Sequence, residues 1–275
     1  MDKAVAAIAN LYHNGNEIVV THGNGPQVGM LATFQKESLA VLTAQTQAWI
    51  GMEIERRLSV ALKKKEKRLD YSVSEVVLTR TIVDRNSAAF RNPSKPIGKF
   101  YTKGEADVLS SKGYVMKKVI NGYRRIVPSP EPKQIIESKM IRQMMDKGKI
   151  VIGCGGGGIA VCKTRYGFDY AEAVIDKDLA SSLLAVELKA DRFIVLTNVD
   201  GAYLNFRKRN QELIGRISAR EMELHLKRGH FEDGSMKPKV EACISFVKET
   251  GNPAGIGNIL HPENVLSFRK LTLII

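Results

Sequence analysis

The sequence has no apolar run that approaches the roughly 18 residues that a membrane-spanning helix needs. Its opening segment does not resemble a secretory signal, because Asn10 and His13 interrupt the short apolar stretch. Cysteine is scarce: Cys154, Cys162 and Cys243 form no Cys-x-x-Cys pair, which argues against a disulfide framework or a metal cluster. Free thiols suit a reducing compartment. We therefore expect a cytoplasmic protein without a membrane partner.

Motifs of several enzyme classes are also missing. The chain has no Gly-x-Ser-x-Gly nucleophile motif, no His-Glu-x-x-His metal motif, and five histidines without metal-ligand spacing. No segment fits the phosphate-binding motif Gly-x-x-x-x-Gly-Lys-Ser/Thr, which disfavours a Walker-type NTPase. Neither a covalent nucleophile nor a protein-bound catalytic metal is indicated.

Acidic residues are outnumbered: 42 lysines and arginines stand against 29 aspartates and glutamates, and the formal net charge is +13. This charge suits either a protein that binds nucleic acid or anionic membranes, or a basic enzyme with anionic substrates. Part of the excess lies in residues 63–68, at the end of a helical pattern, where cations suit the helix dipole. No basic stripe is interleaved with aromatics, so we expect no nucleic-acid partner.

Helical and strand patterns alternate along the chain. Residues 150–152 and 193–196 are continuously apolar, as in strands buried on both faces, which predicts a mainly parallel sheet covered by helices. We expect one α/β domain over residues 1–275. Residues at about 84–130 are richer in Pro, Gly, Lys and Arg and are expected to form a small protruding subdomain.

Several individual segments are predicted from periodicity and from glycine and proline positions. We expect a strand over 73–83, a loop over 91–102, and a helix over 134–148. A further helix is expected over 45–62, and its apolar points are Trp49, Met52, Ile54 and Leu58.

Two glycine-rich loops each follow a predicted strand. Gly23, Asn24 and Gly25 precede a helix, and in a parallel sheet ligands bind at the carboxyl ends of strands. Glycines there let backbone N–H groups approach an anion, although a tight turn without a ligand fits the first loop equally well. Gly155, Gly156, Gly157 and Gly158 give a stronger signal, because four successive glycines carry a large entropy cost.

Three lysines have unusual settings. Lys177 and Lys239 lie at predicted helix starts, and Lys95 lies between two prolines. A cation at a helix start opposes the helix dipole, which suggests that an anion lies between each of the first two lysines and the helix end. Taken singly, each of the three fits an ordinary surface lysine equally well. Asp176 and Asp178 are either ordinary helix-start acids or groups that hold Lys177 or Mg²⁺. Glycine loops, dispersed lysines and a few aspartates fit phosphoryl transfer, which needs positioning and charge neutralisation.

Seven blocks, in order along nearly the whole chain, resemble the carbamate kinase family of the amino acid kinase superfamily. They are THGNGPQVG (21–29), NPSKPIG (92–98), GYRRIVPSP (122–130), VIGCGGGGIAV (151–161), AVIDKD (173–178), LTNVDGAYLNF (196–206) and GSMKPKVEA (234–242). The resemblance implies a three-layer α/β/α sandwich and the reaction ATP + carbamate ⇌ ADP + carbamoyl phosphate. It also implies Mg²⁺ as cofactor, a homodimer, and a place in arginine metabolism through the arginine deiminase pathway.

The resemblance also implies roles for individual residues. Lys177 would stabilise the transferring phosphoryl group, Lys239 the ADP phosphates, and Lys95 would reach in from the subdomain. Asp176 and Asp178 would orient lysine or metal. Gly23, Asn24, Gly25 and Gly155–Gly158 would line the carbamate and phosphoryl site. The nucleotide would lie in the half formed by residues of about 150–275, beside Thr197, Asp200, Tyr203, Met236 and Pro238.

The family pattern also includes a first strand that ends in a Gly-Gly-Asn-Ala turn, and this sequence contains no such turn. Two alternatives therefore stay open beside an active kinase. One is a catalytically impaired relative that still binds nucleotide, and the other is a different kinase of the same superfamily.

Overall fold

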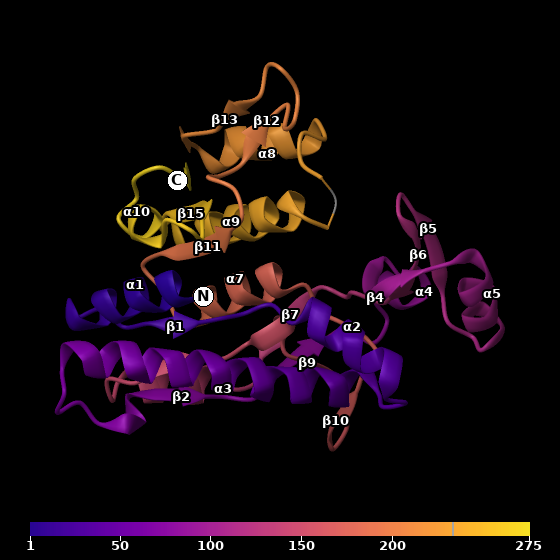
Figure 1. Cartoon of the computed structure of the whole chain (residues 1–275), viewed down its shortest axis with the longest axis horizontal. Coiled ribbons are helices and arrows are strands. Elements are labelled where there is room, and N and C mark those ends of the chain that lie inside the picture. Colours follow the sequence, from indigo (N-terminus) through magenta and orange to yellow (C-terminus); the bar gives the residue numbers. More distant parts are fainter. Residues whose placement is uncertain (233) are drawn as a thin grey trace.

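The structure is a computed structural model that describes residues 1–232 and 234–275. Figure 1 shows its elements. The helices are α1 (Asp2–His13), α2 (Gly25–Phe34), α3 (Leu39–Lys65), α4 (Ala88–Arg91), α5 (Lys103–Ser111), α6 (Ser138–Met145), α7 (Lys177–Glu187), α8 (Ala219–Lys227), α9 (Met236–Thr250) and α10 (Pro262–Leu266), with 3-10 turns η1 (Tyr71–Val73) and η2 (Gly155–Gly157). The strands are β1 (Val19–Val20), β2 (Ser74–Val76), β3 (Arg80–Val83), β4 (Lys95–Tyr101), β5 (Met116–Val119), β6 (Gly122–Val127), β7 (Pro132–Ile135), β8 (Ile150–Ile152), β9 (Ile159–Thr164), β10 (Gly167–Tyr170), β11 (Phe193–Thr197), β12 (Tyr203–Leu204), β13 (Glu212–Leu213), β14 (Arg216–Ile217), β15 (Ala254–Asn258) and β16 (Thr272–Ile274).

Three sheets form the main body, and most of their strand pairs are parallel. The first has the order β1-β8-β2, with both pairs parallel. In the second, β10-β9-β3-β7, the pair β3–β9 is parallel. In the third, β11-β15-β16-β14, the pairs β11–β15 and β14–β16 are parallel. The predicted mainly parallel α/β fold is therefore confirmed.

Helices cover both faces of the β1-β8-β2 sheet. Successive strand residues point to opposite faces. Ile150 of β8 packs with residues of α1 and α3, whereas its neighbour Val151 packs with residues of α6 and α7. Both side chains are fully buried. This arrangement gives the helix–sheet–helix layering that the resemblance implies.

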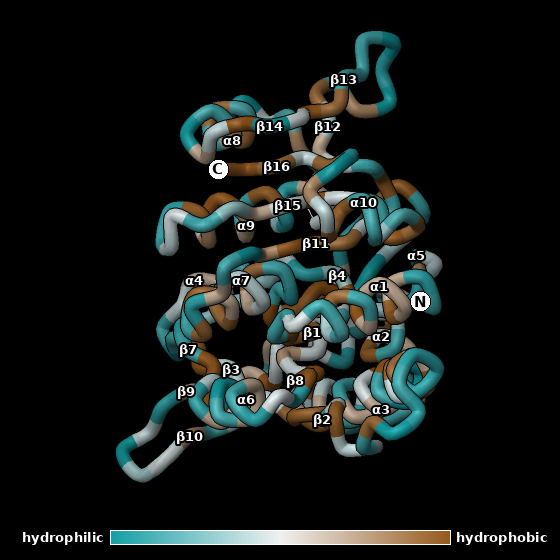
Figure 2. The backbone as a smooth tube through the Cα atoms, turned by 90° about the vertical axis from the view of Figure 1, so that its left-hand side faces the viewer, coloured by the Kyte–Doolittle hydropathy of each residue, from teal (hydrophilic) through white to brown (hydrophobic). Residues whose placement is uncertain are grey.

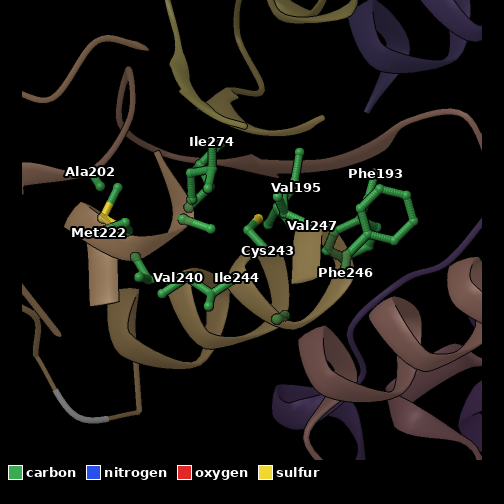
Figure 3. Packing of buried hydrophobic residues seen from close by; sticks show 14 of the residues in the cluster. Phe193, Val195, Ala202, Met222, Val240, Cys243, Ile244, Phe246, Val247 and Ile274 are labelled. Carbon is green, nitrogen blue, oxygen red and sulfur yellow. The ribbon is translucent and has the colours of Figure 1, made fainter. Parts of the chain in front are cut away.

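The C-terminal half has its own apolar core around α9. Figure 3 shows Cys243 and Phe246 of this helix beside Phe193 and Val195 of β11. Ile274 of β16 belongs to the same cluster. Burying such side chains is worth about 1.5–3 kcal/mol each, so this core fixes α9, and with it Lys239 in its first turn, against the sheet.

A three-stranded antiparallel sheet, β4-β6-β5, stands apart from the main body with α4 and α5 (Figure 1). It is the predicted protruding subdomain, although its limits at 84 and 130 stay a prediction. The expected loop over 91–102 is wrong, because Lys95–Tyr101 forms β4. Pro96 is tolerated there because β4 is an edge strand of this sheet.

The predicted strand over 73–83 is also wrong as a single element. Its first part is β2, which pairs with β8, and its last part is β3, which pairs with β9 in another sheet. The predicted helix over 134–148 begins later, as α6 at Ser138, because residues up to Ile135 belong to β7.

The predicted apolar points of the long helix α3 are not all buried. Ile54 and Leu58 are buried, whereas Trp49 and Met52 are 47% and 64% exposed. Near Trp49, the buried face of α3 carries the polar side chain of Gln47, which is 2% exposed.

Among the described residues, no helix combines the length and the apolarity that crossing a membrane requires. Figure 2 shows that the turn between β9 and β10, which projects from the body, is largely hydrophilic.

Candidate functional site

The first glycine loop joins β1 to the N-terminus of α2. Asn24 is the residue before the helix, and it is 3% exposed. Its Nδ2 donates to Thr46 Oγ1 of α3 at 2.9 Å, which fixes the loop against that helix. The first N–H groups of a helix have no acceptor within it, so the start of α2 at Gly25 offers donors and a positive dipole end to an anion.

The second glycine loop needs glycine at most of its positions. Gly156, Gly157 and Gly158 have φ values of 62°, 92° and 83°, in the left-handed region. A Cβ at Gly157 would lie 2.8 Å from Ile175 O, and one at Gly158 would clash with Thr81. Both the backbone conformation and the close packing exclude larger residues here.

The two loops touch each other. Gly156 N donates to His22 O at 2.7 Å. A Cβ added at Gly156 would clash with the amide of Asn24. The structure therefore brings together the two glycine segments that the sequence predicts for one site.

A carboxylate between two lysines lies beside these loops. Lys177 Nζ is 2.6 Å from Asp178 Oδ1, and Lys239 Nζ is 2.8 Å from Asp178 Oδ2. The Asp178 side chain is 5% exposed. Burial opposes its ionisation, but the two lysines outweigh burial and hold the pKa of Asp178 below its usual value.

Lys177 connects this cluster to the first loop. A Cβ at Gly23 would be 3.6 Å from Lys177 Cδ and Cε, so the lysine side chain runs directly past Gly23. The cation therefore lies between the start of α2 and the start of α7.

Lys95 reaches the same place from the subdomain. It forms an ion pair with Asp176, the residue that precedes α7. Asp176 also accepts from Asp178 N at 2.9 Å, which caps the helix. Three lysines and two aspartates thus meet at the N-terminus of α7, and the excess charge is positive.

His22 lies beside the two glycine loops, and its surroundings disfavour the charged form of its ring. Burial lowers its pKa, a contact with Gly23 O opposes this, and the nearby Lys177 lowers the pKa further. A neutral imidazole adds no charge here. Its close packing on Gly155, where a Cβ would clash with the ring, indicates a structural role.

The predicted nucleotide residues lie in two groups. Thr197, at the end of β11, pairs with Asn258, whose Nδ2 donates to Asp200 Oδ1 at 2.8 Å. Burial and Asp200 raise the pKa of Tyr203, on β12. Their roles stay predictions.

The second group lies in the first turn of α9, beside Lys239. Met236 and Pro238 belong to this turn, and Met236 packs against the apolar core of the C-terminal half. Within 1–232 and 234–275, no hydrogen bond joins Met236 or Pro238 to the first group.

Sequence reasoning missed a set of buried polar residues behind the glycine loop: Thr46, Gln47, Thr79 and Thr81. Their exposed fractions are at most 2%. Polar residues on the buried face of a helix or strand are the signal that would have found them, because buried polar groups are retained where they make hydrogen bonds.

This arrangement can hold an anion but not a metal cage of its own. Within the described ranges, no group of three or more His, Cys, Asp or Glu residues is placed to hold a metal ion. Both Asp178 oxygens already face lysines. A divalent cation here would therefore take at most one or two carboxylate ligands from the protein.

Comparison with known proteins identifies the family of this chain. Residues 1–258 match the model of the amino acid kinase family. A carbamate kinase from Thermoplasma volcanium is 45% identical over 268 residues, which cover 94% of this chain and 86% of that protein. A carbamate kinase-like protein from Escherichia coli is 39% identical over 269 residues, which cover 92% and 85%.

A solved structure is also similar over the whole chain. The carbamate kinase from Giardia lamblia bound to AMP-PNP is 34% identical, with a TM-score of 0.86, and the match covers 100% of this chain and 89% of that one. The chain therefore belongs to the amino acid kinase family.

Proposed function

We propose that this protein transfers a phosphoryl group between carbamoyl phosphate and ADP, forming carbamate and ATP, and catalyses the reverse reaction. The observation that carries the proposal is the pair Lys177 and Lys239, held by one buried carboxylate, Asp178, beside two glycine loops that touch. The carbamate kinases similar to this chain support the choice of substrate.

The transferring phosphoryl group would lie at the start of α2, between the loop of Gly23 and the glycine loop of Gly156. In that position backbone N–H groups meet its equatorial oxygens, and Lys177 neutralises the charge that spreads over them. The bond from phosphorus to the carbamoyl oxygen breaks as the bond to the terminal ADP oxygen forms. No protein nucleophile is needed, in keeping with the missing motifs.

ADP would bind along the C-terminal half. Its terminal phosphate would face Lys239, which Asp178 holds in place, and its nucleoside would lie towards Tyr203, Met236 and Pro238. The nucleotide analogue in the Giardia structure supports a nucleotide site in this fold. Mg²⁺ would arrive on the nucleotide and neutralise its phosphates, with Asp176 or Asp178 as the carboxylates within the site.

Purified protein with ADP, Mg²⁺ and carbamoyl phosphate tests the proposal, with ATP followed by coupled luminescence. ATP formation is expected. The same assay run in reverse, with acetylglutamate, aspartate and UMP as acceptors for ATP, tests the alternative that the chain is another kinase of the superfamily. Phosphorylation of one of these, without use of carbamate, would replace the proposal with that alternative.

A second candidate function is suggested by the Escherichia coli protein, which is described as carbamate kinase-like. This second candidate is a nucleotide-binding relative without turnover. Calorimetric ADP binding together with no ATP formation would establish it, whereas any turnover that depends on Lys177 would end it.

A homodimer is the proposed assembly. Trp49 and Met52 lie one helical turn apart on the outer face of α3 and are both exposed, which suits a surface that a second copy covers. Light scattering is expected to give twice the chain mass. A monomer mass at working concentration would contradict this.

A further inference from the structure

Behind the glycine loop lie three buried polar side chains. They are Gln47 of α3, Thr79 between β2 and β3, and Thr81 of β3, and we call them the support residues. Gln47 is 2% exposed and both threonines are fully buried. Buried polar groups are costly unless they are paired, so their hydrogen bonds show what they hold.

Gln47 clamps the chain at the point where it passes from one sheet to another. Its Nε2 donates to Thr79 O at 3.1 Å, and its Oε1 accepts from Thr79 N at 3.1 Å and from Thr79 Oγ1 at 3.0 Å. A single side chain thus satisfies the backbone of Thr79 on both sides. Among the described residues, Gln47 supplies the acceptor for Thr79 N, whereas Thr79 O also accepts from Ile159 N.

The two threonines extend this hydrogen-bond network to both ends of the glycine loop. Thr79 Oγ1 accepts from Cys154 N at 2.9 Å, and Thr79 O accepts from Ile159 N at 2.9 Å. Thr81 Oγ1 donates to Gly157 O at 2.7 Å. The loop is therefore held before its first glycine, after its last, and in its middle.

Such support matters for this loop because a glycine-rich backbone is costly to order. Four glycines make many backbone conformations accessible, and ordering one residue costs roughly 1–2 kcal/mol. Within the loop, Gly157 N donates to Cys154 O and Gly158 N to Gly155 O, while Gly156 N donates to His22. In the part of the chain that the structure describes, Gly155 N–H has no protein acceptor.

We propose that Gln47, Thr79 and Thr81 are positioning residues for the transferred phosphoryl group, because they fix the glycine loop that would bind it. This inference rests on the proposed function. Phosphoryl transfer depends on donors held in place before the substrate arrives, and a misplacement of about 1 Å can lower the rate about 100-fold.

The test compares two replacements at one position. Thr81→Val keeps the shape of the side chain but removes the hydroxyl, and Thr81→Ser keeps the hydroxyl. We expect kcat/KM for carbamoyl phosphate to fall by about 10-fold to 100-fold in Thr81→Val, and Thr81→Ser to restore most of it. The dissociation constant of ADP should stay unchanged, because the nucleotide residues lie elsewhere.

Thr272→Val is the matched control. Thr272 is also fully buried, and its hydroxyl accepts from Ala202 N at 2.8 Å and donates to Ile214 O at 2.6 Å. This variant should lose stability as Thr81→Val does while keeping the wild-type KM for carbamoyl phosphate. Equal kinetic losses in both valine variants would overturn the inference, because the effect would then be general destabilisation.

Hydrogen exchange separates this inference from the proposed function. The amides of Gly156, Gly157 and Gly158 should exchange faster in Thr79→Val and Thr81→Val than in wild type or Thr272→Val. Unchanged loop exchange, or faster exchange with wild-type kinetics, would overturn the inference. If wild-type protein forms no ATP, the proposed function fails together with the phosphoryl role, and loop exchange still reports whether these residues hold the loop.

Discussion

Asn24 packs directly on Gly156, so each of the two glycine loops limits the conformation of the other. The first loop belongs to the start of α2 and the second to the segment between β8 and β9, which lie far apart in sequence. Their contact brings the start of α2 beside the second glycine loop.

Gly156→Ala is expected to abolish most of the activity. The new methyl group would clash with Asn24, and alanine is strained at a φ of 62°. We expect kcat/KM for carbamoyl phosphate to fall at least about 100-fold, because the loops must separate. Steady-state kinetics measure this.

Gly104→Ala is the control for that change. Gly104 lies in α5, and a Cβ there would meet nothing within 4 Å. Alanine is the better helix former, so the control should keep wild-type activity. Similar kinetics in both variants would mean that the loop contact has no catalytic importance.

Asp178→Asn is expected to destabilise the fold at neutral pH. Removing the charge leaves Lys177 and Lys239 facing each other without a partner, and breaking a buried ion pair costs about 3 kcal/mol. Urea unfolding measures the difference from wild type. Asp169→Asn is the control, because the Asp169 pair with Arg85 is more than half exposed and should contribute little.

The difference in stability between wild type and Asp178→Asn should depend on pH. The pKa of Asp178 is below its usual value of 3.8 in the folded state, since the two lysines outweigh burial. As pH falls, the unfolded chain therefore binds the proton before the folded protein does. The stabilisation by ionised Asp178 is complete above about pH 4 and is lost as pH falls further, towards the folded pKa. Wild type and Asp178→Asn should converge in stability towards pH 3. A gap that widens on acidification contradicts this sign.

Much of this site could be predicted from the sequence, because its signals are local. Four glycines in a row and lysines at helix starts stand out without any structure, and the structure brings Lys177, Lys239 and Asp178 together. What escaped prediction depends on distant contacts. Gln47 lies 32 residues from Thr79, and nothing near either residue in sequence shows that they pair.

The same reason explains the wrong segments. Residues 73–83 have the composition of one strand, and only the sheets around them, with the Gln47 clamp, divide them at Thr79. Two prolines favoured a loop over 91–102, whereas pairing with β6 makes an edge strand there. Tertiary partners decided both cases.

The thiols are expected to be inert in the native protein. All three cysteines are buried, and burial raises the pKa of Cys154 to about 12. The thiolate is the reactive form, so a thiol reagent should label native protein very slowly and all three cysteines after unfolding. Rapid labelling of one native thiol would show that its surroundings open.

Lys95→Met is expected to weaken catalysis from the subdomain side. The lysine pairs with Asp176 at the start of α7, and losing one charge-assisted bond in the transition state corresponds to about a tenfold fall in kcat/KM. Lys99→Met is the control on the same strand, because Lys99 pairs with the exposed Glu105. Equal effects of both changes would place Lys95 outside the site.

We propose that Lys177 stabilises the phosphoryl group as it passes between carbamoyl phosphate and ADP. The most direct measurement is the rate of ATP formation from these substrates by wild type, Lys177→Met and Lys147→Met, with ADP affinity measured in parallel. Lys147 is exposed beyond the end of α6, so its variant should match wild type. We predict that Lys177→Met still binds ADP and forms ATP at least about 100-fold more slowly. ATP formation by Lys177→Met at the wild-type rate would contradict the claim.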